Sequence, residues 1–164
     1  IMLKFVFIFA LCFVQIFAQV SPKFSCDFTT IHGFQPEPIE TSPYSIKISS
    51  YEYSPRTKIT VSIEGQFFRG FYVRAFDTTT NEPIGSWEEI LTSLPMDSCN
   101  AAMQADREDK ESIELKWISP PQGRGKVYFK AMVMRDYSTF WTIILSDVND
   151  VKQPNRIARS VYYY

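Results

Sequence analysis

The sequence has little of what an enzyme or a metal site needs. Histidine occurs once in 164 residues, at His32, and no Gly-x-Ser-x-Gly nucleophile motif is present. A serine triad needs a histidine beside an activated serine and an acid, and zinc sites usually take three or four His, Cys or carboxylate ligands. Glu88 and Glu89 are adjacent, so on a helix their carboxylates would point apart. We therefore expect no catalytic residues, no metal and no cofactor.

Long apolar runs are also scarce, and the one that exists lies at the amino terminus. Lys4 precedes the run Phe5 to Phe17, which ends at the small residue Ala18. This pattern is typical of a secretory signal peptide, here residues 1–18. A membrane anchor is the alternative, but the run is too short for a hydrocarbon core of about 30 Å. We expect a secreted, extracellular protein with no transmembrane segment.

Cysteine occurs three times, at Cys12, Cys26 and Cys99. Cys12 lies in the predicted signal peptide, which leaves Cys26 and Cys99 as an even pair in an oxidising compartment. Two free buried thiols are the alternative to a disulfide between them. A bridge closing a loop of this length would stabilise the fold by roughly 4 kcal/mol in the loop-entropy description.

Charge is nearly balanced overall, with 17 Lys and Arg against 18 Asp and Glu, but it is unevenly distributed. Residues 19–115 are acidic, whereas residues 116–164 are basic. A basic region attracts anionic polymers through its summed potential. Strands from both halves interleave in a sandwich, so the basic third need not form one surface. The candidate ligand-binding residues are Arg69, Arg124, Lys126, Lys130, Arg156 and Arg159.

Alternating apolar and polar residues predict several short strands. Lys58 to Ile63 and Lys126 to Arg135 each place apolar residues at every second position, as do Tyr44 to Tyr51, Gly70 to Phe76, Ser112 to Ile118 and Phe140 to Ser146. Each pattern is typical of a half-buried strand. With the turn signals between them, these strands predict an all-β fold, an immunoglobulin- or fibronectin-like antiparallel β-sandwich with one short helix and one disulfide.

Three connecting segments carry more specific expectations. Ser86 to Leu91 has a candidate N-cap, two early acidic residues and an apolar face, which predicts the short helix. The prolines of residues 21–43 argue against a helix in that lead. Pro120 to Gly125 predicts a turn that makes the strands on either side antiparallel neighbours. The charged run Asp106 to Glu111 lacks the ligand spacing of a calcium loop and predicts a solvated loop.

Three further segments carry expectations, and for the first and the last of them two alternatives stay open. His32-Gly33 is either a ligand contact or a turn that satisfies backbone groups, with Gly33 permitting a positive φ. In Phe67-Phe68-Arg69-Gly70-Phe71 the aromatic rings fill the sandwich and Gly70 allows a close approach or a bulge. Residues 152–164 form either a final edge strand or a flexible tail. We therefore divide the chain into a signal peptide (1–18), one domain (19–151) and this tail.

The order of motifs resembles that of the reeler-domain family. The positions that carry the resemblance are His32-Gly33, Pro43-Tyr44, Ile46, Tyr53, Pro55, Ile59, Val61, Gly65, Phe68-Arg69-Gly70-Phe71, Gly85, Trp87, Cys99, Lys110, Trp117, Pro120, Gly125, Val127, Phe129, Phe140-Trp141 and Ser146. They cover about Cys26 to Val151. Many spaced aromatic, glycine and cysteine positions in one order make a specific signal.

Two positions depart from the family pattern. Many members have a Thr-His pair where this chain has Met103-Gln104, so a role of that histidine does not transfer. The glycine that usually follows the proline of the Tyr-x-Pro motif is replaced by Arg56. Taken as a whole, the chain is similar to the stand-alone secreted arthropod defence-protein branch of the family.

The resemblance implies a secreted innate-immunity protein that binds microbial surface components and is not an enzyme. The expected partners are lipopolysaccharide, peptidoglycan or glucan. The alternative is an extracellular matrix or cell-adhesion module that binds an anionic glycosaminoglycan or a protein receptor. We expect a monomer with no nucleic-acid partner, because the domain is secreted and not basic overall.

Overall fold

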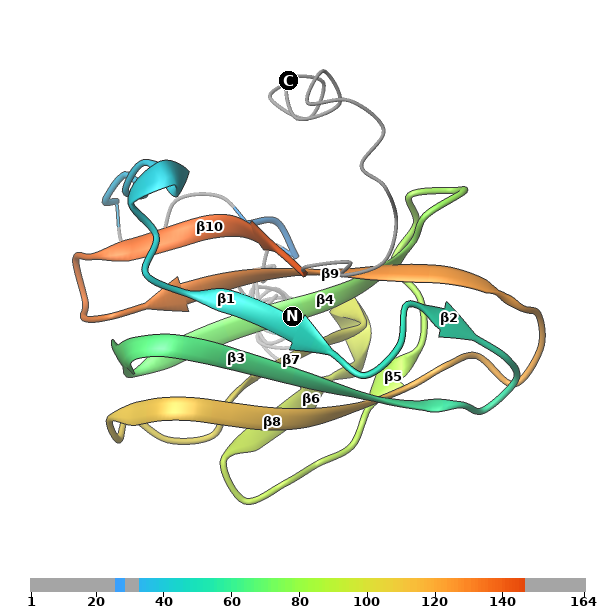
Figure 1. Cartoon of the computed structure of the whole chain (residues 1–164). Coiled ribbons are helices and arrows are strands. Elements are labelled where there is room, and N and C mark those ends of the chain that lie inside the picture. The colour runs from blue at the N-terminus through green and yellow to red at the C-terminus, as the bar shows by residue number, and fades with distance from the viewer. Residues whose placement is uncertain (1–25, 29–32, 147–164) are drawn as a thin grey trace, which may run out of the picture.

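Two antiparallel β-sheets pack face to face in the computed structural model, which describes residues 26–28 and 33–146 (Figure 1). Cys26 to Phe28 lie against the outer side of the larger sheet, where they contact its side chains. The predicted signal peptide, the tail 152–164 and His32 lie outside the described residues. The all-β sandwich that the sequence predicts is confirmed.

The smaller sheet has four strands in the order β1-β3-β8-β5. They are β1 (Ser45–Ile48), β3 (Lys58–Phe68), β8 (Lys110–Ile118) and β5 (Ser86–Trp87). Alternation along β3 sends Ile59, Val61 and Ile63 into the core and leaves the polar residues between them outside. This period of two is what a sheet with one solvated face requires.

The larger sheet has the order β10-β9-β4-β7-β6, with β2 paired separately to β9. Its strands are β2 (Glu52–Tyr53), β4 (Gly70–Asp77), β6 (Ser93–Met96), β7 (Ala101–Gln104), β9 (Gly125–Met134) and β10 (Phe140–Leu145). The central strand β4 is buried on both faces except at Arg74. A second layer therefore covers part of this sheet on the side away from the core.

The main core lies between the sheets and centres on aromatic rings. Trp117 of β8 and Phe129 of β9 are fully buried and meet edge to face at 5.7 Å between ring centroids. A smaller cluster lies on the opposite side of the larger sheet and consists of Tyr72, Cys99, Ala101, Met132 and Phe140, with Cys26 and Phe28 packed against it. The residues around Cys26 thus act as the cover of this second cluster.

The predicted helix over Ser86 to Leu91 is wrong. Ser86–Trp87 form strand β5, in which Trp87 pairs with Trp117 and is 5% exposed. The Trp87 Nε1–H donates to the Asn100 carbonyl at 3.1 Å, and the Asn100 side chain donates to the Gly85 carbonyl at 2.8 Å. Core burial of one ring and pairing with β8 override the local helix signals. In the described part of the chain, the helices that do form are single 3₁₀ turns, Ile39–Thr41 and Asp97–Cys99.

The predicted pairing across Pro120 to Gly125 is also wrong. The segment connects β8 of the smaller sheet to β9 of the larger sheet, so it is a crossing between layers and not a hairpin. The reason is that β8 already has β3 on one side and β5 on the other. Ser119 begins the crossing, and its Oγ donates to the Ser54 carbonyl at 2.6 Å.

Two expectations about the lead and the charged run are refined. The proline-rich lead does contain the 3₁₀ turn Ile39–Thr41, and Thr41 Oγ1 accepts a hydrogen bond from Trp141 Nε1 at 2.9 Å. Within the run Asp106 to Glu111, Lys110 is buried at the start of β8. Its Nζ lies 2.5 Å from Asp106 Oδ1 and 2.8 Å from the Glu108 carbonyl. The loop therefore folds around a buried lysine.

Candidate functional site

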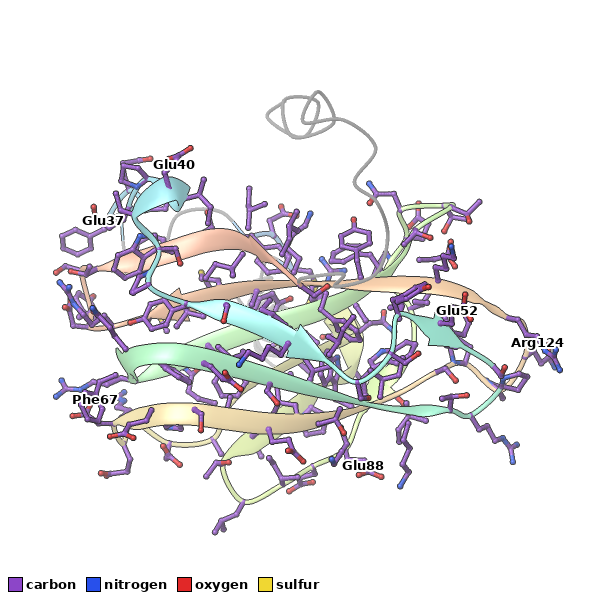
Figure 2. The ribbon with its side chains drawn as sticks, in the orientation of Figure 1. Glu37, Glu40, Glu52, Phe67, Glu88 and Arg124 are labelled. Carbon is purple, nitrogen blue, oxygen red and sulfur yellow. A yellow bond between two sulfur atoms is a disulfide. The ribbon has the colours of Figure 1, made fainter. Side chains whose placement is uncertain are left out.

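The basic residues predicted to bind ligand do not form one surface. Figure 2 shows Phe67 and Arg124 at opposite ends of the sandwich. Arg69 lies next to Phe67, at the corner between β3 and β4. Lys126 and Lys130 both lie on β9, two alternations apart on its outer face. Arg156 and Arg159 lie outside the described residues. Only Lys126 and Lys130 are brought onto a shared face.

Arg69 is already neutralised by a partner within the chain. Its Nε lies 2.6 Å from Asp109 Oδ1, and both side chains are more than half exposed. The hydrogen bond from Arg69 to Asp109 and the charge of Asp109 raise the pKa of the guanidinium. Because the two opposite charges lie side by side, the pair presents little net charge to a ligand.

Lys126 and Lys130 lie over aromatic rings. The Lys126 Nζ is 5.4 Å from the Tyr51 ring centroid. The Lys130 Nζ is 4.8 Å from the centroid of Phe76 and 5.6 Å from that of Phe28. An ammonium over a ring face at such distances is attracted by the ring quadrupole, by about 0.5–1 kcal/mol at exposed sites.

Arg74 completes this arrangement, although it was not among the residues predicted from the sequence to bind ligand. Its guanidinium carbon lies 5.2 Å from the Phe76 ring centroid, and Arg74 is directly opposite Lys130 in the β4–β9 ladder. The alternation of β4 indicated that Arg74 and Phe76 share a face. The pairing of β4 with β9 brings Lys130 beside them, and the sequence did not predict this pairing.

A stacked pair of rings links the two lysines. Phe76 and Tyr128 lie 5.4 Å apart with an interplanar angle of 20°. The Tyr128 hydroxyl donates to the Asn81 side-chain oxygen, which anchors the ring to the β4–β5 loop. We call the set on this outer face the cation–aromatic surface. Its members are Phe28, Tyr51, Arg74, Phe76, Lys126, Tyr128 and Lys130.

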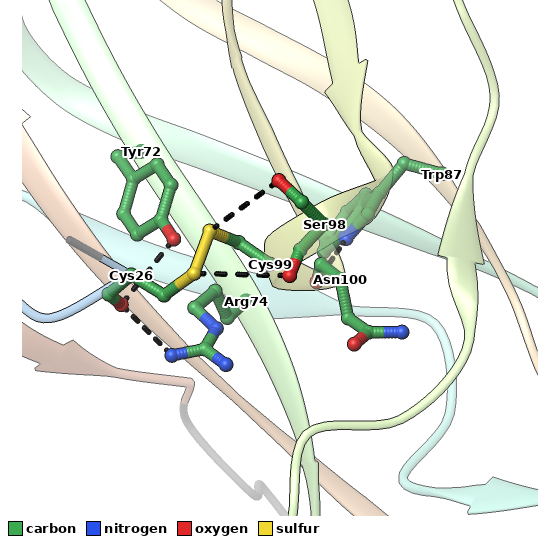
Figure 3. The surroundings of a disulfide bond; sticks show 7 residues. All are labelled: Cys26, Tyr72, Arg74, Trp87, Ser98, Cys99 and Asn100. Atoms are coloured by element: carbon green, nitrogen blue, oxygen red, sulfur yellow. Dashed lines mark hydrogen bonds between the residues drawn. A yellow bond between two sulfur atoms is a disulfide. The ribbon is translucent and has the colours of Figure 1, made fainter. Parts of the chain in front are cut away.

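The disulfide holds one side of this surface in place. Cys26 and Cys99 are bonded, as predicted, with 5.4 Å between their Cα atoms. Figure 3 shows the Cys26 carbonyl accepting hydrogen bonds from the Arg74 guanidinium at 2.8 Å and from the Tyr72 hydroxyl at 3.3 Å. The bridge thereby fixes the segment that carries Phe28 over the sheet, and it orients Arg74.

The charges of the surface lack carboxylate partners. Among residues 26–28 and 33–146, no Asp or Glu lies within ion-pair distance of Arg74, Lys126 or Lys130; Glu52 is opposite Lys126 in the β2–β9 ladder without forming such a pair. Burial, and then the positive charge of Arg74, lower the pKa of the Lys130 ammonium. The three cations therefore lie next to aromatic rings without an ion pair among the described residues.

The two departures from the family pattern have structural explanations. The Gln104 Oε1 accepts a hydrogen bond from the Phe71 backbone N–H at 2.8 Å, so this side chain joins β7 to the start of β4. Arg56 has φ 57°, a conformation that favours glycine, which explains why glycine suits this turn. Gln104 therefore acts here as a packing and hydrogen-bonding residue.

Within residues 26–28 and 33–146, no group of three or more His, Cys, Asp or Glu side chains is placed to hold a metal ion. No helix in the same part of the chain is long and apolar enough to cross a membrane.

Two antiparallel sheets around one core, with a disulfide that pins a covering segment, define a β-sandwich of the immunoglobulin-like class. The chain belongs to the reeler family, because the model of the Reeler domain matches residues 24–156. Among solved structures, the reeler domain of human F-spondin (fragment 1) is similar, with a TM-score of 0.54 and 21% identity. The match covers 64% of this chain and 86% of that domain, and it establishes the fold alone.

Curated relatives fall into two groups. Ferric-chelate reductase 1 of Mus musculus is 30% identical over 132 residues, which are 76% of this chain and 21% of that protein. The protein named "Putative defense protein 2" of Antheraea mylitta is 26% identical over 149 residues, which are 84% of this chain and 92% of that protein. The chain thus spans about a fifth of the reductase and nearly all of the insect protein.

Proposed function

We propose that this chain is a secreted innate-immunity protein that binds microbial surface polymers through the cation–aromatic surface. The observation that carries the proposal is that three cations lie over aromatic rings without a carboxylate partner among the described residues. Such groups meet both needs of an anionic glycan, whose sugar faces pack on rings and whose charged substituents attract cations. Lipopolysaccharide and peptidoglycan carry such charged groups, whereas β-glucan is a neutral polymer that could contact only the rings.

Geometry supports a polymer ligand in preference to an isolated small molecule. Lys126 and Lys130 are separated by four residues of an extended strand, or about 13 Å. A polymer with repeated units can occupy both positions at once, and each further contact raises the effective concentration of the next.

The relatives support the defence role and secretion. Curated insect proteins named as defence proteins match over most of their own length, whereas the reductases match over about a fifth of theirs. The disulfide between Cys26 and Cys99 suits an oxidising compartment. The surface offers cations and rings but no acid and base pair, so we assign it binding and no catalysis.

Retention on immobilised polymers tests the proposal. The protein is made in a secreting host so that the disulfide forms, then passed over lipopolysaccharide, peptidoglycan and β-glucan at several salt concentrations. We expect retention on at least one polymer that falls as salt rises, because exposed charges are screened within about 10 Å at 0.1 M salt. No salt-sensitive retention on any of the three would contradict the proposal.

Matched double variants locate the site. Lys126→Gln with Lys130→Gln removes two charges from the cation–aromatic surface, and Lys47→Gln with Lys58→Gln removes two from the opposite sheet. We expect only the first pair to lose retention. Equal loss in both variants would mean that net charge, and not this surface, determines binding.

The alternative function is that of an adhesion module for a host glycosaminoglycan. The same retention experiment, with immobilised heparin added, distinguishes it from the defence function. Retention on heparin with none on microbial polymers would favour it. Induction of the transcript after bacterial challenge is an independent measurement, and a flat response in immune tissue would also favour adhesion.

A further inference from the structure

The most unusual feature of the larger sheet is a pair of like charges placed directly opposite each other. Arg74 and Lys130 are Cα partners in the β4–β9 ladder, at the centre of the sheet. Like charges at such positions destabilise a sheet. Proteins break rules of this kind mainly at functional sites.

Both charges converge on one ring. The Arg74 guanidinium carbon and the Lys130 Nζ lie 5.2 Å and 4.8 Å from the Phe76 centroid. Phe28, held by the disulfide-linked segment, borders Lys130 from the other side at 5.6 Å. The two cations therefore share one small region with aromatic walls.

The hydrogen-bonding capacity of the pair is not used up by the protein. One N–H group of Arg74 donates to the Cys26 carbonyl, while its Nε is buried without a hydrogen-bond partner in the described structure. Lys130 makes no hydrogen bond within the described residues, and neither side chain has a carboxylate within ion-pair distance there. A planar guanidinium and a flexible ammonium are the groups that proteins use to bind phosphate.

We infer that Arg74 and Lys130 form a subsite for a phosphate monoester carried by the bound polymer. A phosphate monoester has a charge near −2 at neutral pH, because its second pKa is about 6, and so matches two cations. A sulfate ester or a carboxylate has one negative charge and compensates half of the pair. The inference rests on the proposed function and names the chemical group that this surface selects.

Three small anions test the inference without any polymer. Methyl phosphate, methyl sulfate and acetate are titrated into the full chain at pH 7.5 and followed by calorimetry and by the NMR signals of Arg74 and Lys130. We expect methyl phosphate to bind about tenfold more tightly than methyl sulfate, which has the same shape with one charge fewer. Equal affinity of the two, or binding that does not perturb Arg74 and Lys130, would overturn the inference.

Variants separate the subsite from general charge effects. Lys130→Gln should abolish the preference for methyl phosphate, and Arg74→Lys should reduce it while keeping the charge. Lys116→Gln, on the outer face of the other sheet, is the matched control and should bind like the original protein. Thermal unfolding verifies that each variant is folded, and an unchanged preference in folded Lys130→Gln would count against the subsite.

Retention experiments with whole polymers identify the source of the phosphate. They also test the subsite and the proposed function separately. Lipopolysaccharide before and after phosphatase treatment is compared with heparin, which carries sulfate and carboxylate groups. Loss of retention after phosphatase treatment supports the subsite. Retention on polymers without any preference for methyl phosphate would contradict the subsite and leave the proposed function. A preference for methyl phosphate without retention on any polymer would contradict the proposed function alone.

Discussion

The outer faces of the two sheets treat positive charge in opposite ways. On the smaller sheet, Lys47 lies 2.5 Å from Glu64, Lys116 lies 2.6 Å from Glu114, and Lys58 pairs with Glu88. On the larger sheet, Arg74, Lys126 and Lys130 lie over aromatic rings and have no such partner among the described residues. The numbers of cations are similar, but their surroundings differ.

This difference indicates where a ligand can bind. A lysine beside a carboxylate contributes little potential beyond its own pair, and exposed pairs stabilise by at most about 1 kcal/mol. A lysine over a ring keeps its charge available and has an apolar neighbour that a sugar can contact. The count of basic residues is therefore a poor guide to a binding surface, and the absence of counter-charges is a better one.

Removal of the disulfide should have the largest effect on this contrast. In the double variant Cys26→Ala and Cys99→Ala, the segment with Phe28 loses its covalent attachment and is held only by hydrogen bonds and packing. We expect the free energy of unfolding to fall by about 2–5 kcal/mol, measured by urea titration. The folded variant should also bind a hydrophobic dye at the uncovered cluster around Met132. An unchanged urea midpoint would mean that the cover is held by packing alone.

A smaller effect is expected at the turn that joins β9 to β10. Burial alone would raise the pKa of Asp136, but hydrogen bonds from the N–H groups of Ser138 and Thr139, at 3.0 and 2.9 Å, help to lower it to about 2. A lowered folded-state pKa contributes stability that is complete above the unfolded value of 3.8 and is lost as pH falls toward 2. Because the Asp136 side chain is partly exposed, solvent screens part of this stabilisation.

Asp136→Asn should therefore destabilise the protein by roughly 1 kcal/mol at pH 7 and by less at pH 2. Urea titrations at pH 7, 4 and 2 measure the difference. Asp109→Asn, at an exposed pair, is the comparison variant. A constant difference across these pH values would show that the Asp136 charge is not the stabilising feature of the turn.

Lys130→Met should reveal the cost of unpaired charge on the larger sheet. The substitution removes a like charge opposite Arg74, so we expect a stabilisation of about 0.5 kcal/mol at pH 7 together with loss of polymer retention. Because the folded-state pKa of Lys130 is lowered, wild-type stability rises with pH between that value and the unfolded value of 10.5. The advantage of the variant should shrink over the same range. Destabilisation at pH 7 would contradict this interpretation.

The smallest effect is expected on the smaller sheet. Lys47→Gln breaks the pair with Glu64, whose side chains are 62% and 37% exposed. We expect a change in the free energy of unfolding within about 0.5 kcal/mol and unaltered polymer retention. A loss of retention comparable to that of Lys130→Gln would end the functional distinction between the two faces.

Local patterns predicted strands β1, β3, β4, β8, β9 and β10 but not the short strands β2, β5, β6 and β7. They failed where an element depends on a distant partner. Alternation of Ile59, Val61 and Ile63 predicted β3, because a strand that buries one face has an apolar residue at every second position. Trp87 lies in a segment with helix signals, yet its ring is needed in the core beside Phe129. No local signal reports that requirement.

The same holds for the candidate site. Lys126 and Lys130 were proposed because they are basic residues in the basic last third of the chain. Arg74 was missed because it lies 56 residues earlier, in a strand whose neighbour was unknown. Arg69 and Arg124 were also included on charge. The structure places Arg69 at the β3–β4 corner, next to Phe67, and Figure 2 shows Phe67 and Arg124 at opposite ends of the sandwich.

The sequence by itself determined the class of the fold, the disulfide and the family, since alternation, an even cysteine pair and ordered motifs are local or countable properties. Only the tertiary structure decided which charges meet and which are cancelled. The physical reason is that strand pairing joins residues from distant parts of the chain. The pairing of β4 with β9 set Arg74 against Lys130 over one ring, while the pairing of β1 and β3 gave Lys47 its carboxylate.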